Sequence, residues 1–140
     1  MRRIVSIVCL AALAACGGGA DSPTTPARIF PSMAGVWSIT GAFTNGIPFH
    51  GTVTFAQASL QQPALGGSMN TTAETPLGPV NTAATITGSV SENGILLFNP
   101  IPPVGSLSSS RYSGVVTGTS VTGVLSDGSQ TVATFTMAKQ

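Results

Sequence analysis

The stretch GVWSITGAFTNGIPFHGTVTF, residues 35–55, decides the fold of this chain. Apolar and polar side chains alternate along it with a period of two, so that Trp37 and Phe43 share one face of an extended segment. Residues 49–55 repeat the alternation, and Asn45-Gly46 between the two halves is a pair suited to a tight turn. The stretch therefore predicts two antiparallel β-strands joined as a hairpin.

The same pattern continues to the C-terminus. Short segments rich in Val, Ile and Thr are divided by turn residues, and Asn93-Gly94 is the sharpest hairpin signal. No apolar stripe recurs at helical spacing for three turns, so no helix is expected. The expected strands cover residues 35–43, 49–55, 66–72, 80–90, 95–98, 111–117, 120–125 and 131–138.

Eight evenly spaced strands joined mostly by tight turns predict an all-β fold. The expected architecture is a single eight-stranded antiparallel up-and-down β-barrel, because closure removes the exposed edges of an open sheet. Glycines within the strands, at 41, 51, 88, 114 and 123, agree with a sheet that must bend. A β-sandwich of two sheets is the alternative architecture.

The N-terminus has the composition of a secretory leader. Arg2 and Arg3 give a positive start, residues 4–15 are nearly all apolar, and small residues precede Cys16. The apolar run is shorter than the roughly 20 residues that a membrane-spanning helix needs. Removal of the leader takes Cys9 with it, which leaves Cys16 as the single cysteine of the mature chain and rules out an internal disulfide.

Leu13-Ala14-Ala15-Cys16 resembles the lipobox of bacterial lipoproteins. The resemblance implies cleavage before Cys16 and attachment of two or three acyl chains to that residue, which anchor a protein firmly to a membrane. It also implies a location in the cell envelope. Gly17 follows the cysteine in place of the aspartate that retains lipoproteins at the inner membrane, which favours the outer membrane where the host has one.

The chain then divides into three parts. Residues 1–15 are the lipoprotein signal peptide, residues 16–33 a lipidated flexible linker, and residues 34–140 the β-barrel domain. The linker is assigned from its glycines and prolines and from the lack of any apolar period.

Gly35-Val36-Trp37 is similar to the Gly-x-Trp that opens the first strand of lipocalins and related small barrels. The resemblance implies a structural role for Gly35 and Trp37, with the tryptophan closing one end of the barrel. It also implies that a basic side chain late in the fold packs over the ring, and Lys139 or Arg111 is placed to do so. The alternative is that Trp37 is an ordinary core aromatic residue.

Composition and motifs exclude several functions. The mature chain carries three basic and four acidic side chains, and no basic cluster that would neutralise a phosphate backbone, so no nucleic acid is expected as a partner. A single His and a single remaining Cys cannot form a zinc site. His50 with Asp127 and a serine, or Glu74 with Glu92, is aligned by no catalytic motif. No catalytic residues, metal or cofactor are therefore expected, and the protein is not expected to be an enzyme.

Two functional hypotheses remain. The first is a binding module that holds a small hydrophobic ligand inside the barrel. The second is a structural or interaction module of the cell envelope with a solid core. It would contact envelope proteins through the loops farthest from the membrane. These loops carry an apolar fringe that suits either a ligand mouth or a protein contact, namely Ile47, Leu77, Ile101 and Val104. In both, the lipid on Cys16 binds the membrane. The residues expected to line the ligand site of the first are Phe43, Val53, Phe55, Ile86, Leu97 and Tyr112.

Overall fold

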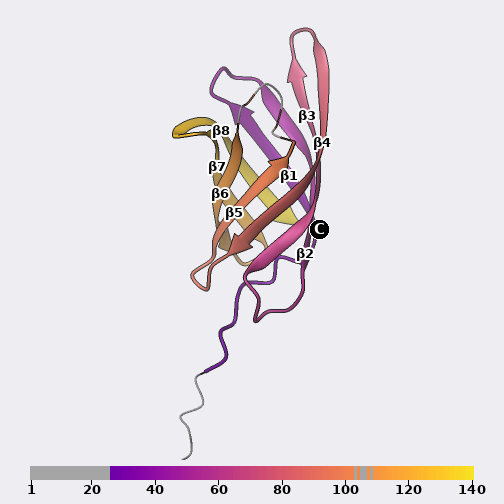
Figure 1. The fold of residues 1–140 in the computed structure, drawn as a ribbon. Helices are drawn as coiled ribbons and strands as arrows, with labels where there is room; N and C mark the ends of the chain where they lie inside the picture. Colours follow the sequence, from indigo (N-terminus) through magenta and orange to yellow (C-terminus); the bar gives the residue numbers. More distant parts are fainter. Residues whose placement is uncertain (1–25, 103, 105–106, 108) are drawn as a thin grey trace, which may run out of the picture.

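The structure is a computed structural model that describes residues 26–102, 104, 107 and 109–140. Eight antiparallel strands form one closed barrel in sequence order, and β1 pairs with β8 to complete it (Figure 1). The up-and-down barrel is confirmed and the sandwich is wrong. The strands are β1 (Gly35–Phe43), β2 (Pro48–Gln57), β3 (Ala64–Thr75), β4 (Gly78–Val90), β5 (Ile95–Ile101), β6 (Ser110–Thr117), β7 (Ser120–Asp127) and β8 (Gln130–Lys139).

The structure does not test the N-terminal assignments. The expected signal peptide, the expected lipidation site Cys16 and most of the expected linker lie outside the described residues. They stay predictions from the sequence.

The hairpin of β3 and β4 is longer than expected and projects beyond the barrel wall (Figure 1). The expected strands left residues 73–79 between them, but only residues 76 and 77 separate β3 from β4. The Thr75 hydroxyl donates a hydrogen bond to the Gly78 carbonyl at 2.6 Å, and Gly78 has a φ of 116°, which favours glycine. Pro79 is tolerated in β4 because a proline at the edge of a sheet needs no N–H donor there.

Aromatic rings fill the middle of the barrel. Phe98 stacks on Tyr112 with ring centroids 4.6 Å apart, and Phe55 and Phe135 meet this pair edge-on, each at 5.3 Å. All four side chains are buried. Contacts of this geometry add to the gain from burying the rings, so the middle of the barrel is a packed core.

Glycines inside the strands make room for these rings. Gly41 lies opposite Phe49 and Gly88 lies opposite Phe98 in the strand register. A Cβ atom on Gly41 would come within 2.5 Å of the Phe49 ring, and one on Gly88 within 2.6 Å of the Phe98 Cβ. At these two positions the glycines therefore serve to leave space for neighbouring rings and backbone, and the expectation that they bend the wall stays a prediction.

Trp37 closes the end of the barrel at which the described chain enters. Its ring is fully buried, and its Nε1–H donates to the Met33 carbonyl at 2.8 Å. The Lys139 Nζ lies 5.7 Å from the Trp37 ring centroid and 3.4 Å from the Ser32 carbonyl oxygen. The basic side chain expected over the tryptophan is thus Lys139, and Arg111 does not take this role.

The barrel domain begins earlier than residue 34. Phe30 and Met33 are both buried in the core, although both were assigned to the flexible linker. The Phe30 N–H donates to the Leu60 carbonyl at 2.8 Å, and the Met33 N–H donates to the Gln57 side-chain oxygen at 2.9 Å. Two apolar residues without a strand-like period gave no signal in the sequence, and only the folded barrel provides the surface that they cover.

Candidate functional site

The barrel has two different ends. The connections after β1, β3, β5 and β7 lie together at one end, here called the mouth. At the other end, the closed end, the described chain enters the barrel (Figure 1). There Phe30 bonds to Leu60 between β2 and β3, and Arg28 pairs with Glu92 between β4 and β5. The loops expected to lie together, far from the entering chain, do share one end; they carry Ile47, Leu77, Ile101 and Val104.

A pocket of about 350 Å³ occupies the mouth. Its volume is at the lower end of the range of about 300–1,000 Å³ that is typical of small-molecule sites. No charged side chain lines it within the part of the chain that the structure describes. The lining consists of Phe43, Ile47, Ala73, Val80, Val104, Leu107 and Val132, which are apolar, and of Thr44, Asn45, Thr75 and Thr82.

The polar groups of the mouth partly serve its own turns. The Asn45 side-chain oxygen accepts a hydrogen bond from the Ile47 N–H at 3.2 Å. The Thr75 hydroxyl oxygen accepts one from the Leu77 N–H at 3.3 Å, in addition to its bond to Gly78. The Val104 N–H donates to the Ser110 hydroxyl at 2.9 Å, which fixes Val104 in the lining. These bonds fix the turns that carry the apolar side chains of the lining, and the polar atoms among them are uncharged.

Most of the predicted ligand-binding residues lie beneath this pocket and not around it. Val53, Phe55, Ile86 and Tyr112 point into the barrel as expected, but each is at most 2% exposed and belongs to the packed core. Phe43 alone among the predicted set lines the mouth pocket. A ligand therefore has room above the core and not inside it.

The prediction that Leu97 lines the interior is wrong. Its side chain is 38% exposed on the outer surface, whereas those of Leu96 and Phe98 point inward. Residues 95–98 are apolar on both faces, so the sequence did not show which face is buried. The register decides it, because Phe98 lies opposite Gly88, where the wall leaves room for a ring.

The four apolar residues expected around the mouth differ in their exposure to solvent. Ile47 is half-buried in the pocket lining, and Val104 is buried. Leu77 and Ile101 are exposed. Sequence reasoning missed five lining residues, Ala73, Val80, Thr82, Leu107 and Val132. All except Leu107 lie in strands next to the predicted loops, and the alternation of inward and outward side chains was the available signal for them.

Burial also affects the one tyrosine of the chain. Removal from water disfavours the phenolate and raises the pKa of Tyr112 above its ordinary value. Since the ring is stacked in the core, we assign Tyr112 to packing and not to the mouth pocket.

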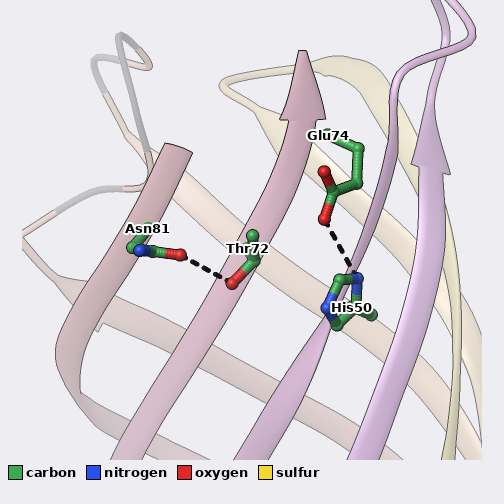
Figure 2. Close-up of polar contacts among 4 residues, drawn as sticks. All are labelled: His50, Thr72, Glu74 and Asn81. Atoms are coloured by element: carbon green, nitrogen blue, oxygen red, sulfur yellow. Dashed lines mark hydrogen bonds and ion pairs between the residues drawn. The ribbon is translucent and has the colours of Figure 1, made fainter. Parts of the chain in front are cut away.

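Polar pairs lie on the outer face of β2, β3 and β4 near the mouth (Figure 2). The His50 Nδ1 is 3.9 Å from a Glu74 carboxylate oxygen, and both side chains are about half exposed. Beside them the Thr72 hydroxyl donates to the Asn81 side-chain oxygen at 2.7 Å. These contacts join neighbouring strands across a solvent-facing surface and point away from the pocket.

The acidic residues considered for catalysis are far from one another in the fold. Asp127 ends β7 and accepts a hydrogen bond from the Ser109 N–H at 2.9 Å, whereas His50 lies beside Glu74. Glu92 pairs with Arg28 at 3.3 Å on the closed end, opposite to Glu74. β1 and β8 separate β2, which carries His50, from β7, which carries Asp127. The structure therefore brings together neither His50 with Asp127 nor Glu74 with Glu92.

A metal-binding cluster and a membrane-spanning helix are both absent from the described residues. In them, no three His, Cys, Asp or Glu side chains gather in a way that could hold a metal ion. The same part of the chain contains no helix of the length and hydropathy needed to cross a membrane.

No protein-family profile and no curated protein matches the sequence. Solved barrels share the fold. One is a de novo designed fluorescence-activating β-barrel, with a TM-score of 0.51 and 16% identity over 81% of this chain and 96% of that one. Another is a redesigned β-barrel, mFAP1, bound to DFHBI, with a TM-score of 0.55 and 15% identity over 76% of this chain and 94% of that one. At such identities the likeness concerns the fold alone.

Proposed function

We propose that this protein is a lipid-anchored, non-catalytic binding module of the bacterial cell envelope that takes a small, uncharged, apolar ligand at the mouth of its barrel. The observation that carries the proposal is the pocket of about 350 Å³ with its mostly apolar and uncharged lining. Burial of apolar surface there would drive binding at about 25 cal/mol per Å². A charged ligand group would lose its hydration without gaining a partner, which is costly.

The position of the pocket agrees with the proposed anchor. The resemblance of Leu13-Ala14-Ala15-Cys16 to a lipobox supports lipidation of Cys16, and Gly17 favours the outer membrane. The described chain enters the barrel at the closed end, so an anchor attached there would leave the mouth facing away from the lipid. A ligand could then reach the pocket from the aqueous side.

A barrel of this fold can hold a small molecule, since mFAP1 was solved bound to DFHBI. The parallel lends support to the class of function and says nothing of which ligand this chain binds.

Titration with a neutral naphthylamine dye, whose emission rises in apolar surroundings, tests the proposal. Ile47→Glu places a charge in the pocket lining and should weaken dye binding by at least about tenfold, which corresponds to about 1.4 kcal/mol. Leu77→Glu is the matched control, because Leu77 is fully exposed at the nearby hairpin tip. An unchanged emission with the wild-type protein, or an equal loss in both variants, would contradict the proposal.

A second candidate function is supported by the open edge of β4. Within the described residues, β4 pairs with β5 only from Val90 to Thr85, so residues 78–84 have a neighbour on the β3 side alone. Leu77, Val80 and Ile101 are exposed beside this edge. An envelope protein could add a strand there. Failure of every neutral probe to bind the mouth, together with cross-linking of a partner at Val80, would favour this function.

A further inference from the structure

Exposed apolar side chains gather at the closed end of the barrel. Nine large apolar side chains are exposed in the described part of the chain, and three of them, Leu77, Val80 and Ile101, belong to the mouth. The other six lie toward the closed end, on strand ends and on the segment that enters the barrel. They are Ile29, Val36, Leu60, Ile95, Leu97 and Val115.

Five of these six form an arc, here called the closed-end patch: Ile29, Leu60, Ile95, Leu97 and Val115. Ile95 and Val115 lie directly opposite each other in the register of β5 and β6, and they are 43% and 47% exposed. Ile29 is 65% exposed, and the residues that flank it reach both sides of the arc. Phe30 bonds to Leu60, and Arg28 pairs with Glu92, three residues before Ile95. Exposed apolar side chains that gather at one end of a domain are typical of a contact surface.

The charges of the closed end allow contact with lipid. Arg28 and Glu92 neutralise each other at 3.3 Å, and Lys139 leaves a net side-chain charge of +1 on the described part of this end, which Asp21 of the expected linker offsets. The mouth carries Arg111 against Glu74 and Asp127 and has the opposite sign. Anionic lipid headgroups attract basic residues near the surface, so they would favour the closed end over the mouth.

The distance to the expected anchor is short. Residues 17–27 separate Cys16 from Arg28, and a flexible chain of this length spans on average roughly 17–20 Å. A tether this short holds the patch near the lipid at an effective concentration of about millimolar. Even a weak contact between the patch and the membrane would then be populated.

We propose that the closed-end patch docks on the lipid surface, so that the domain rests on the bilayer with its mouth turned outward. This inference rests on the proposed lipidation of Cys16. The apolar side chains of the patch enter the headgroup region, while the paired Arg28 and Glu92 stay at the polar boundary.

The test uses the full lipidated protein in phosphatidylcholine vesicles, with and without brominated acyl chains. A fluorophore is attached at Gln61→Cys, next to Leu60 at the closed end, or at Thr131→Cys, an exposed site at the mouth. Brominated lipid should quench the fluorophore at position 61 and leave the one at position 131 unchanged. Leu60→Ser with Ile95→Ser should reduce the quenching at least about twofold, because both side chains would lose their transfer into lipid.

Leu77→Ser with Ile101→Ser is the matched control, since it removes the same kind of exposed side chain from the mouth. It should leave the quenching unchanged. Vesicle-bound protein without quenching at position 61, or with equal quenching at both positions, would overturn the docking alone. Protein that does not float with the vesicles would remove the anchor, and the docking proposal with it.

Discussion

Phe98 and Tyr112 stack face to face in the middle of the barrel, with ring centroids 4.6 Å apart and ring planes within 4° of parallel. They come from facing positions of β5 and β6, so the register of two neighbouring strands places them together. The pair closes the interior beneath the mouth pocket. The barrel therefore offers a ligand a shallow site at its rim, although its strand number would also suit a deep one.

The fit between glycines and rings predicts a severe effect of Gly88→Ala. A Cβ atom at position 88 would lie 2.3 Å from the Leu97 carbonyl oxygen and 2.6 Å from the Phe98 Cβ. The backbone must shift to relieve these contacts, so we expect a loss of about 1–3 kcal/mol in the free energy of unfolding. Urea unfolding followed by Trp37 emission measures it.

Gly66→Ala is the matched control for this substitution. A Cβ atom at Gly66 would meet nothing within 4 Å, so we expect a change of no more than about 0.5 kcal/mol. Similar losses in the two variants would show that glycine flexibility, and not space for Phe98, explains the in-strand glycines.

The contact between Lys139 and Trp37 predicts a smaller effect at the closed end. Lys139→Gln removes the ammonium 5.7 Å from the ring centroid, and we expect unfolding to become easier by about 0.5–1 kcal/mol. Trp37 emission of the folded protein should change as well, because the charge beside the ring is lost. Arg111→Gln, at an exposed position, should change neither quantity. Equal effects of the two substitutions would exclude a specific contact with Trp37.

The barrel could be predicted from the sequence because strands and tight turns leave local patterns in it. Alternation in residues 35–55 and the Asn93-Gly94 turn show strand and hairpin directly, and eight such segments close in sequence order. The resemblance at Gly35-Val36-Trp37 also led to Lys139 or Arg111 as the basic side chain over the ring, and the structure shows that it is Lys139. The interior was harder to predict, since Leu97 and Phe98 carry equally apolar side chains, and only pairing with β4 shows which one is inside.

The candidate site was predicted only in part for a related reason. Phe43 was expected to touch a ligand and does line the pocket, but Phe55 and Tyr112 fill the space that they were expected to border. Whether a barrel interior is empty depends on how rings from four strands meet, and strand number does not determine this. Val104 was placed at the mouth together with its loop, but its burial could not be predicted, because it lies in a connection without strand alternation.

Burial of Tyr112 predicts a dependence of stability on alkaline pH. Its pKa is raised in the folded protein, while in the unfolded chain it returns to about 10. Below that value the phenol is neutral in both states and stability does not depend on it. Above it, only the unfolded chain loses the proton, so the free energy of unfolding falls as the pH rises.

The chain contains one tyrosine, so the absorbance of tyrosinate reports on Tyr112 alone. We expect the tyrosinate band to appear together with the loss of folded structure and not before it. Tyr112→Phe should unfold at higher pH than the wild type, as measured by Trp37 emission. A band that appears while the barrel is still folded would contradict a desolvated phenol.

The packed rings beneath the mouth predict that a deeper binding site can be opened by removing one of them. Phe98→Ala deletes the ring that contacts both Phe55 and Tyr112, and we expect it to cost about 3–5 kcal/mol in the free energy of unfolding. Where the variant remains folded, an apolar cavity should connect with the mouth pocket, and the neutral naphthylamine dye should bind more tightly than to the wild type. Val121→Ala, which truncates a fully buried side chain near the closed end, is the control and should lower stability without tighter binding. Unchanged dye affinity in a folded Phe98→Ala protein would mean that the neighbouring rings collapse into the space, and that the mouth pocket is independent of the core below it.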